Sequence, residues 1–470
     1  MSTFIVVVQW AYLIYFISIS TGYLTLNLLS FVAMRRYFAS RPLDHLPPSY
    51  SGIEPPVSII VPAYNEEKTI VQSIKSLLQL DYPDFEILVI NDGSSDGTLA
   101  TLQSEFALQP FPEAYWARLK SNPVRTIYRS PLHTNLRIID KENGGKADAL
   151  NVGLNAARYP LFCAVDADSI LQRNSLRRVL EPFLEDPHTV ASGGTVRVAN
   201  GCEVSGGFMT RIDVPKKMLP LIQTVEYLRA FLFGRLGWTV FNSVLVISGA
   251  FGLFRKEAVI EAGGYKIKTI GEDMEVVVRL HRLFRARKKP YSVHFTPEPV
   301  CWTEAPESLK VLRNQRIRWQ RGLAESLVLN RALLFSRNGG GPGWLAFTFM
   351  AIFEWWGPLF EILASLFMTF LFVTNNISGV AFLTFIALEF ALGLLLSMSA
   401  LLLEEISFHL YPNFSHIGRL MMAAVIENFG YRQINTVWRL IGLWRWLIGT
   451  KASWGNMTRT GSWNASVDKN

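Results

Sequence analysis

Three long apolar stretches constrain this chain more than any other feature of its sequence. Residues 4–34 are almost free of charge, and residues 344–373 and 380–403 are similarly apolar near the other end. Crossing the roughly 30 Å hydrocarbon core of a bilayer takes about 20 consecutive apolar residues in a helix. Only a polar turn at residues 374–378 separates the last two stretches. We therefore predict an N-terminal membrane helix and a membrane hairpin.

Charges beside the first stretch predict its orientation. Arg35, Arg36 and Arg41 follow it directly, and basic residues favour the cytoplasmic side of a membrane. No small-residue cleavage site follows, so we expect a retained span rather than a signal peptide. This places Met1 outside and the residues from about 35 onward in the cytoplasm.

The region after the hairpin leaves two interpretations open. Charged side chains such as Arg419, Glu427, Arg432 and Arg439 interrupt its apolar pattern, which would be costly in lipid. Both interfacial helices and a further crossing are compatible with this pattern. The total number of membrane spans is then three, four or five. The predicted organisation is a membrane helix (1–34), a cytoplasmic domain with interfacial helices (35–340), a membrane hairpin (341–403), interfacial or further membrane helices (404–450) and a C-terminal segment (451–470).

Composition excludes several other classes of protein. With 18% charged and 50% hydrophobic residues, the chain is neither disordered nor a disulfide scaffold. Cys163, Cys202 and Cys301 lack the paired spacing of a zinc site, and we expect them to be reduced. The formal charge is +8, but no nucleic-acid motif accompanies it, so we expect membrane lipids and not nucleic acid as the anionic partner.

The middle of the chain has the pattern of an α/β domain. Short apolar runs alternate with helical patterns, which is typical of a parallel sheet covered by helices. The predicted strands are 57–61, 85–90, 136–139 and 161–165, and the predicted helices include 66–80 and 146–157.

Polar residues follow several of these strands, where ligands bind in open α/β sheets. Asp166 and Asp168 follow the fourth strand as a pair of hard oxygen ligands suited to Mg²⁺ or Mn²⁺ on a diphosphate. Lys146, after Gly144 and Gly145, adds a cation. The glycine signatures of dinucleotide-binding and P-loop domains are missing. Turn and helix-cap chemistry explains any one of these strand ends alone, but not all of them together.

Six motifs in order give the chain a family resemblance. It resembles the membrane-integrated, processive family 2 glycosyltransferases, such as cellulose, hyaluronan and poly-N-acetylglucosamine synthases. The matching stretches lie between residues 57 and 322: VSIIVPAYNE (57–66), VINDGSSD (89–96), NGGKA (143–147), DAD (166–168), GED (271–273) and QRIRW (315–319). Relatives often have Thr where Gly271 stands.

The resemblance implies a GT-A fold (an α/β Rossmann-like domain), a UDP-sugar donor and a divalent metal, Mg²⁺ or Mn²⁺. It also implies a role for each matching residue. Those roles are uridine binding by Ala63, Tyr64, Glu66 and Asp92, with Lys146 nearby; nucleotide and metal binding by Asp166 and Asp168; general base catalysis by Asp273; acceptor or diphosphate binding by Gln315, Arg318 and Trp319; and a gate-like segment with Trp454 and Arg459.

Two of these roles have bland alternatives. Asp273 could serve only as a negative charge at a helix N-terminus. Trp319 could be a buried tryptophan with a purely structural role. Residues 216–254 also have two interpretations. They could form interfacial helices that contact the acceptor near Gly249, or helices of an ordinary core.

The sequence therefore predicts an inverting hexosyltransferase in the inner (plasma) membrane of a bacterium, with its catalytic domain in the cytoplasm. We expect it to extend a β-linked polysaccharide and to export it. The alternative is transfer of one sugar to a lipid carrier, and a silent nucleotide-sugar-binding protein is a further rival. The motifs fix neither the donor sugar nor the linkage.

Overall fold

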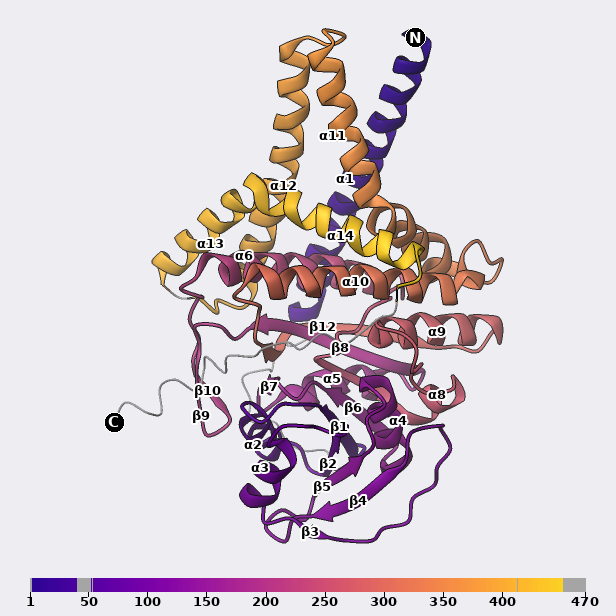
Figure 1. Ribbon diagram of the computed structural model, residues 1–470, viewed down its shortest axis with the longest axis vertical. Coiled ribbons are helices and arrows are strands. Elements are labelled where there is room, and N and C mark those ends of the chain that lie inside the picture. The colour runs from indigo at the N-terminus through magenta and orange to yellow at the C-terminus, as the bar shows by residue number, and fades with distance from the viewer. Residues whose placement is uncertain (1, 40–51, 53, 412, 451–470) are drawn as a thin grey trace.

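The structure is a computed structural model that describes residues 2–39, 52, 54–411 and 413–450. Long helices stand at one end, the sheet domain forms the other, and shorter helices lie crosswise between them (Figure 1). The prediction that the middle of the chain forms an α/β domain is confirmed.

One mixed sheet organises the domain, in the order β3-β4-β5-β2-β1-β6-β11-β8-β12-β7. Its strands are β1 (Val57–Ala63), β2 (Phe85–Asn91), β3 (Gln109–Pro110), β4 (Val124–Arg129), β5 (Leu136–Lys141), β6 (Leu161–Val165), β7 (Ile170–Leu171), β8 (Thr189–Val198), β11 (Phe251–Arg255) and β12 (Ser292–Thr303). A separate hairpin joins β9 (Glu203–Ser205) and β10 (Phe208–Arg211).

The centre of the sheet is parallel, as the sequence predicts. β1 pairs in parallel with β2 and β6, and β2 with β5. Parallel strands buried on both faces are rich in apolar residues, and every residue of β6 is apolar and buried. Beyond this centre the sheet is mixed, because β11 returns between β6 and β8 and runs antiparallel to both.

Helices cover the sheet and build the layers above it. They are α2 (Ile70–Leu78), α3 (Thr98–Glu105), α4 (Lys146–Ala156), α5 (Ser175–Glu185), α6 (Met218–Leu228), η1 (Arg229–Arg235), α7 (Leu236–Thr239), α8 (Lys256–Glu261), α9 (Glu272–Ala286), α10 (Leu309–Leu329) and η2 (Arg331–Leu333). The predicted helix at 66–80 begins only at Ile70, because the residues before it form a loop in which Glu66 N–H donates to Thr98 Oγ1 (2.9 Å).

The apolar ends of the chain form the long helices. They comprise α1 (Ser2–Ala39), η3 (Pro342–Phe347), η4 (Met350–Trp355), α11 (Gly357–Val373) and α12 (Gly379–Ser407). Two helical segments, Ile5–Ala39 and Gly379–Ser407, are long and apolar enough to span a membrane; Pro342–Trp355 with Gly357–Val373, bent by 47°, makes a third if it counts as one span. This agrees with three of the predicted spans.

The interrupted region after the hairpin folds into α13 (Phe414–Ile426), η5 (Glu427–Tyr431) and α14 (Arg432–Leu447). None of these helices qualifies as a span among the described residues. They lie crosswise below the long helices (Figure 1), where α14 packs on α10 and α13 packs on α6. Their arrangement favours the interfacial alternative for residues 404–450, while the domain boundaries themselves stay predictions.

A buried ion pair joins the sheet to the long apolar helix α12. Arg197 of β8 donates to Glu404 near the end of α12, and the two side chains are 1% and 2% exposed. Removing one member of a buried pair leaves the other charge without its counterion in a medium of low dielectric constant.

We expect Arg197→Met to lower the free energy of unfolding by about 3–5 kcal/mol, because it strands the Glu404 carboxylate. Replacing both residues, Arg197→Met with Glu404→Leu, should restore most of the loss. Thermal unfolding of both variants in detergent measures this, with the exposed Arg125→Met as control. Equal losses in the single and double variants would contradict the role of the pair.

Candidate active site

A pocket of about 1230 Å³ opens at the carboxyl ends of β1, β2 and β6. It gathers every described residue to which the sequence assigns a role. These are Ala63, Tyr64, Glu66, Asp92, Lys146, Asp166, Asp168, Asp273, Gln315, Arg318 and Trp319. Trp454 and Arg459 lie outside the described residues. The shared location agrees with the predicted site, while the individual roles stay predictions.

Asp92, at the end of β2, organises one side of the pocket. Its carboxylate accepts hydrogen bonds from Lys141 Nζ (2.5 Å), Gly144 N (3.0 Å) and Gly145 N (2.7 Å). Asp148 also contacts Lys141 Nζ, at 2.7 Å, and both carboxylates are buried. Asp92 therefore holds the turn that presents Lys146. No role was predicted for Lys141, which ends β5 two residues beyond the predicted strand 136–139.

The loops after β1 and β2 are tied together at the pocket rim. Asn65 Oδ1 accepts a hydrogen bond from Ser95 N at 2.8 Å. Gly93 has a φ of +66°, and a Cβ there would lie 2.9 Å from Asn143 N. Glycine is the residue that fits both the left-handed backbone and the close neighbour.

Lys146 lies among carboxylates from two motifs. Its Nζ is 2.6 Å from Asp166 Oδ1 and 3.3 Å from Glu272 Oε1. Burial lowers the pKa of Lys146, but Asp166 and Glu272 outweigh burial, so its pKa lies above the ordinary value. Burial raises the pKa of Glu272 to about 7. The nearby charge of Asp273 also raises this pKa, whereas Lys146 lowers it. The lysine thus stays charged and links the two acidic motifs.

Asp166 and Asp168 offer the oxygen ligands of a divalent cation site. Both line the pocket at the end of β6, and Thr303 Oγ1 donates to Asp168 Oδ2 (3.4 Å). Among the described residues, no group of three or more His, Cys, Asp or Glu side chains is placed to hold a metal. The two carboxylates fit Mg²⁺ or Mn²⁺ if a diphosphate supplies further oxygen ligands.

Asp273 lies in the first turn of α9, facing the loop before β11. Its Oδ2 accepts a hydrogen bond from Gly249 N (3.2 Å), and its Oδ1 from Met274 N (2.8 Å). The carboxylate therefore has both the helix-terminal position and a place in the pocket wall. The two interpretations of Asp273 are compatible.

One face of α10 forms the opposite wall. Gln315, Arg318 and Trp319 all line the pocket, as expected for residues three and four positions apart on a helix. Trp319 is 43% exposed, so the buried structural alternative is wrong. The Arg316 guanidinium stacks 4.5 Å from the indole centroid and pairs with Glu226 at 2.6 Å. Trp319 is thus held from one side while part of its ring remains accessible.

The helices that carry Asp273 and Trp319 approach each other through two glycines. A Cβ built on Gly271 would lie 2.9 Å from the backbone of Gly322, and the reverse holds for Gly322. Ser326 Oγ donates to Gly271 O (3.2 Å), and Glu325 Oε2 accepts from Ile270 N (2.9 Å). The contact leaves no room for a side chain at either glycine.

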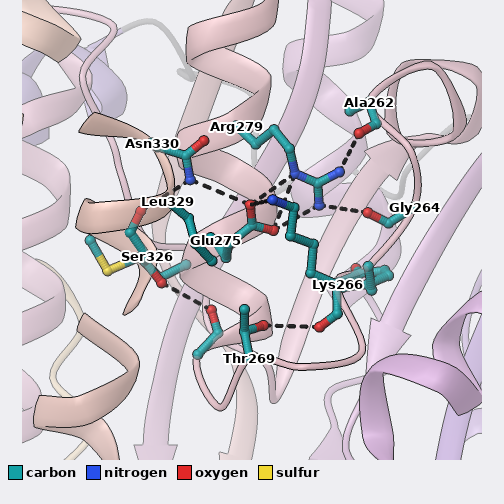
Figure 2. Close-up of polar contacts among 12 residues, drawn as sticks. Ala262, Gly264, Lys266, Thr269, Glu275, Arg279, Ser326, Leu329 and Asn330 are labelled. Atoms are coloured by element: carbon teal, nitrogen blue, oxygen red, sulfur yellow. Dashed lines mark hydrogen bonds and ion pairs between the residues drawn. The ribbon is translucent and has the colours of Figure 1, made fainter. Parts of the chain in front are cut away.

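A buried polar cluster around Glu275 and Arg279 fixes α9 further (Figure 2). Glu275 is fully buried and pairs with Arg279 at 2.7 Å. Arg279 also donates to the carbonyls of Ala262 and Gly264, and Asn330 Nδ2 reaches Glu275 Oε1 at 3.4 Å. The cluster therefore joins α9 to the end of α10 and to the loop after α8.

Three further pocket residues escaped the sequence analysis. Tyr227, Phe231 and Arg235 line the pocket from α6 and η1. Their four-residue spacing in an apolar stretch matches an ordinary core helix, so no local signal separated them from the rest of residues 216–254.

Two family models match the chain. Residues 58–263 match "Glycosyl transferase family 2", and residues 161–398 match "Glycosyl transferase family group 2". The second match covers more than half of the sequence and includes part of the long helices.

Curated relatives share sequence with part of the chain. Poly-beta-1,6-N-acetyl-D-glucosamine synthase of Staphylococcus aureus (strain COL) is 31% identical over 275 residues, which are 58% of this chain and 55% of that protein. The Staphylococcus epidermidis synthase is 30% identical over 273 residues, with the same shares. The match thus spans about half the length of these relatives.

A solved structure shares the fold. Mannosyltransferase PcManGT from Pyrobaculum calidifontis, in complex with GDP-Man and Mn²⁺, superposes with a TM-score of 0.52 at 18% identity, covering 88% of this chain and 99% of that one. At this identity the likeness concerns the fold alone, and it agrees with the predicted GT-A class.

We expect Gly322→Ala to destabilise the protein by about 1–3 kcal/mol, the usual cost of adding a methyl group to a packed contact. The added Cβ would meet the backbone of Gly271, which no side-chain rotation relieves. Thermal unfolding measures the change. Gly418→Ala on α13, where a Cβ meets nothing within 4 Å, is the control and should not destabilise. If the Gly322 variant were as stable as the wild type, α9 and α10 could move apart without cost, and the close contact would not constrain them.

Proposed function

Since the chain belongs to glycosyl transferase family group 2, we propose that it transfers sugar from a UDP-sugar to the end of a β-linked polysaccharide. The observation that carries this proposal is one pocket that holds a carboxylate pair, a third carboxylate and an accessible tryptophan: Asp166, Asp168, Asp273 and Trp319. Transfer to a growing chain needs a donor site, a base and an acceptor platform close together.

The sugar we propose is N-acetylglucosamine, on the strength of the staphylococcal synthases. Those enzymes are named for a β-1,6-linked polymer. Because the match covers about half of each relative, donor, linkage and product are all part of the proposal.

We assign the donor end of the pocket to Ala63, Tyr64, Glu66 and Asp92, with uridine between the loops after β1 and β2. Lys146 and Arg318 supply positive charge for the diphosphate. Asp166 and Asp168 would hold Mg²⁺ or Mn²⁺, which stabilises the charge of the departing UDP when bound. Lys146 already lies 2.6 Å from Asp166, so cation and carboxylate meet where the diphosphate would lie.

Inversion follows if the acceptor hydroxyl attacks the anomeric carbon from the side opposite the diphosphate. The new C–O bond forms as the bond to UDP breaks, and Asp273 takes the hydroxyl proton. The Gly249 N–H, 3.2 Å from Asp273 Oδ2, orients that carboxylate. Trp319 gives the acceptor sugar a flat aromatic surface, which binds a pyranose without fixing its position along the chain.

We propose that the protein is an integral inner-membrane enzyme with this pocket in the cytoplasm, and that the polymer leaves along its own membrane helices. Two helices that are long and apolar enough to span, Ile5–Ala39 and Gly379–Ser407, support the membrane placement. The wall formed by η1 packs against α1 and α12, which supports an exit on that side.

Incubation with single radiolabelled UDP-sugars tests the proposal. With the purified chain in nanodiscs and Mg²⁺ or Mn²⁺, we expect high-molecular-weight product from UDP-N-acetylglucosamine. Chelation with EDTA should stop incorporation, and added Mn²⁺ should restore it. Short lipid-linked product alone would favour the lipid-carrier alternative, and no incorporation from any donor would contradict the proposal.

Asp273→Asn should lower the transfer rate by about 10²–10⁴-fold, the usual contribution of a positioned general base. UDP binding, measured by calorimetry, should persist because the amide keeps the size of the side chain. Asp166→Asn should instead weaken UDP binding in the presence of Mn²⁺. Glu257→Gln, at an exposed carboxylate outside the pocket, is the control, and full transfer by the Asp273 variant would exclude this residue as the base.

A further inference from the structure

The connection between α10 and η3 carries an exposed aromatic pair. Phe335 and Trp344 are 59% and 49% exposed. Their rings meet edge to face, with centroids 5.2 Å apart. The indole Nε1–H of Trp344 donates to the carbonyl of Ser336 at 3.1 Å. The two rings are therefore held against each other at the surface of the protein and not in its core.

The backbone at Phe335 adopts a conformation that a bulky residue rarely takes. Its φ is +53°, in the left-handed region where the Cβ crowds the backbone. Because more than half of the side chain is exposed, burial against the described residues offsets little of this strain. An apolar surface outside the protein would give the exposed ring a favourable environment.

The aromatic pair belongs to a larger group of exposed apolar residues. Leu345 is exposed beside Trp344, and Val240 and Phe241 are exposed after α7. Gly341 brings the two segments together, since a Cβ there would lie 2.9 Å from Phe241 O. We call these residues the apolar patch: Val240, Phe241, Phe335, Trp344 and Leu345. Exposed apolar residues gathered in one place mark a binding surface.

The apolar patch lies at one end of a candidate membrane span. Trp344 and Leu345 are in η3, which begins the bent pair Pro342–Trp355 and Gly357–Val373. The connection from α10 to η3 lies at the level of the crosswise helices, at the foot of the long helices (Figure 1). Aromatic residues are enriched at the corresponding depth of membrane proteins, where lipid headgroups meet water.

The charges beside the aromatic pair are all positive. Arg331 and Arg337 are exposed on either side of Phe335, and the sequence has no Asp or Glu between Glu325 and Glu354. The cytoplasmic face of a membrane is anionic and attracts basic residues next to a span. Exposed rings between two arginines therefore match such a surface in both polarity and charge.

We propose that the apolar patch inserts into the headgroup region of the surrounding bilayer, and that Arg331 and Arg337 bind the phosphates of anionic phospholipids there. This inference rests on the membrane placement in the proposed function and adds a lipid contact outside the spans. Because α10 leads directly into this connection, the contact would also fix how far the pocket lies from the membrane.

A lipid surface fits the apolar patch better than a protein partner. Specific protein interfaces use about 20–30 residues on each side, whereas the patch consists of a few side chains on two short segments. A protein bound here would also compete with the lipid that surrounds the start of the candidate span.

Fluorescence quenching measures the insertion. The three native cysteines are buried, so a single introduced cysteine can be labelled selectively in the full chain. F335C and, separately, L345C are labelled in nanodiscs whose phosphatidylcholine carries a doxyl quencher near the glycerol end of an acyl chain. We expect this lipid to remove most of the emission at both positions. L132C, at an exposed residue between β4 and β5 of the sheet domain, is the control and should keep its emission.

L366C, at an exposed residue of α11 in the bent pair, separates this inference from its premise. Quenching at L366C without quenching at F335C and L345C would overturn the lipid contact. Absence of quenching at L366C would overturn the membrane placement, and the inference with it. A disulfide-linked dimer of F335C in place of quenching would identify a second copy as the occupant and would also overturn the inference. If F335C unfolds, L345C decides alone.

The role of the two arginines is tested with lipids of different charge. In the F335C chain, quenching by doxyl-labelled phosphatidylglycerol is compared with quenching by doxyl-labelled phosphatidylcholine. We expect a preference for the anionic lipid of up to about fivefold for each arginine, the scale of one basic residue at an anionic surface. R331Q with R337Q should remove this preference, and R125Q, at an exposed arginine of β4, should keep it. An unchanged preference in the double variant would overturn the headgroup contact.

Discussion

The contact between Gly271 and Gly322 is the constraint on which the pocket geometry depends. Each glycine leaves room for the other's backbone, and a Cβ at either position would come within 2.9 Å of it. Gly271 directly precedes α9 and its Asp273, while Gly322 follows Trp319 by one turn of α10. The separation of the proposed base and the acceptor platform is therefore set by backbone packing. The cluster around Glu275 and Arg279 (Figure 2) also ties α9 to the end of α10.

Ion pairs connect the sheet and the crosswise helices to the long apolar helix α12. Arg197 pairs with Glu404 of α12, Arg229 with Glu427 of η5, and Glu427 also accepts from Ser397 of α12. Such pairs cost desolvation, so apolar packing would hold the layers together at least as well. The pairs constrain the relative orientation of the elements that they join, because a guanidinium and a carboxylate bind each other in few geometries. The sheet, the crosswise helices and α12 are thereby held in one register.

The sequence predicted the parts of the site that depend on local order. Four central strands and the polar loops at their ends follow from apolar runs and turn residues, and the Gln-x-x-Arg-Trp face of α10 follows from helical spacing. It did not predict the mixed edge of the sheet, because the antiparallel return of β11 depends on packing between distant segments. Arg279 begins a run rich in basic residues (279–289), a pattern that is typical of a solvated helix face. Arg279 is 4% exposed, since Glu275 one turn earlier and two backbone carbonyls satisfy its guanidinium.

The difference between local order and long-range packing also applies to the pocket. The donor end can be predicted from the sequence, whereas the wall formed by α6 and η1 cannot. The donor end is built from short loops, in which Asp92 fixes the turn before Lys146 across only about fifty residues of chain. The wall with Arg235 takes its position from η1 packing on α1 and α12, elements separated from it by up to two hundred residues. A π-helical arginine in an apolar stretch has no sequence signature of its own. Its position follows from the packing of η1 on these two long apolar helices, so the helices that the proposed function places in the membrane also shape one wall of the pocket.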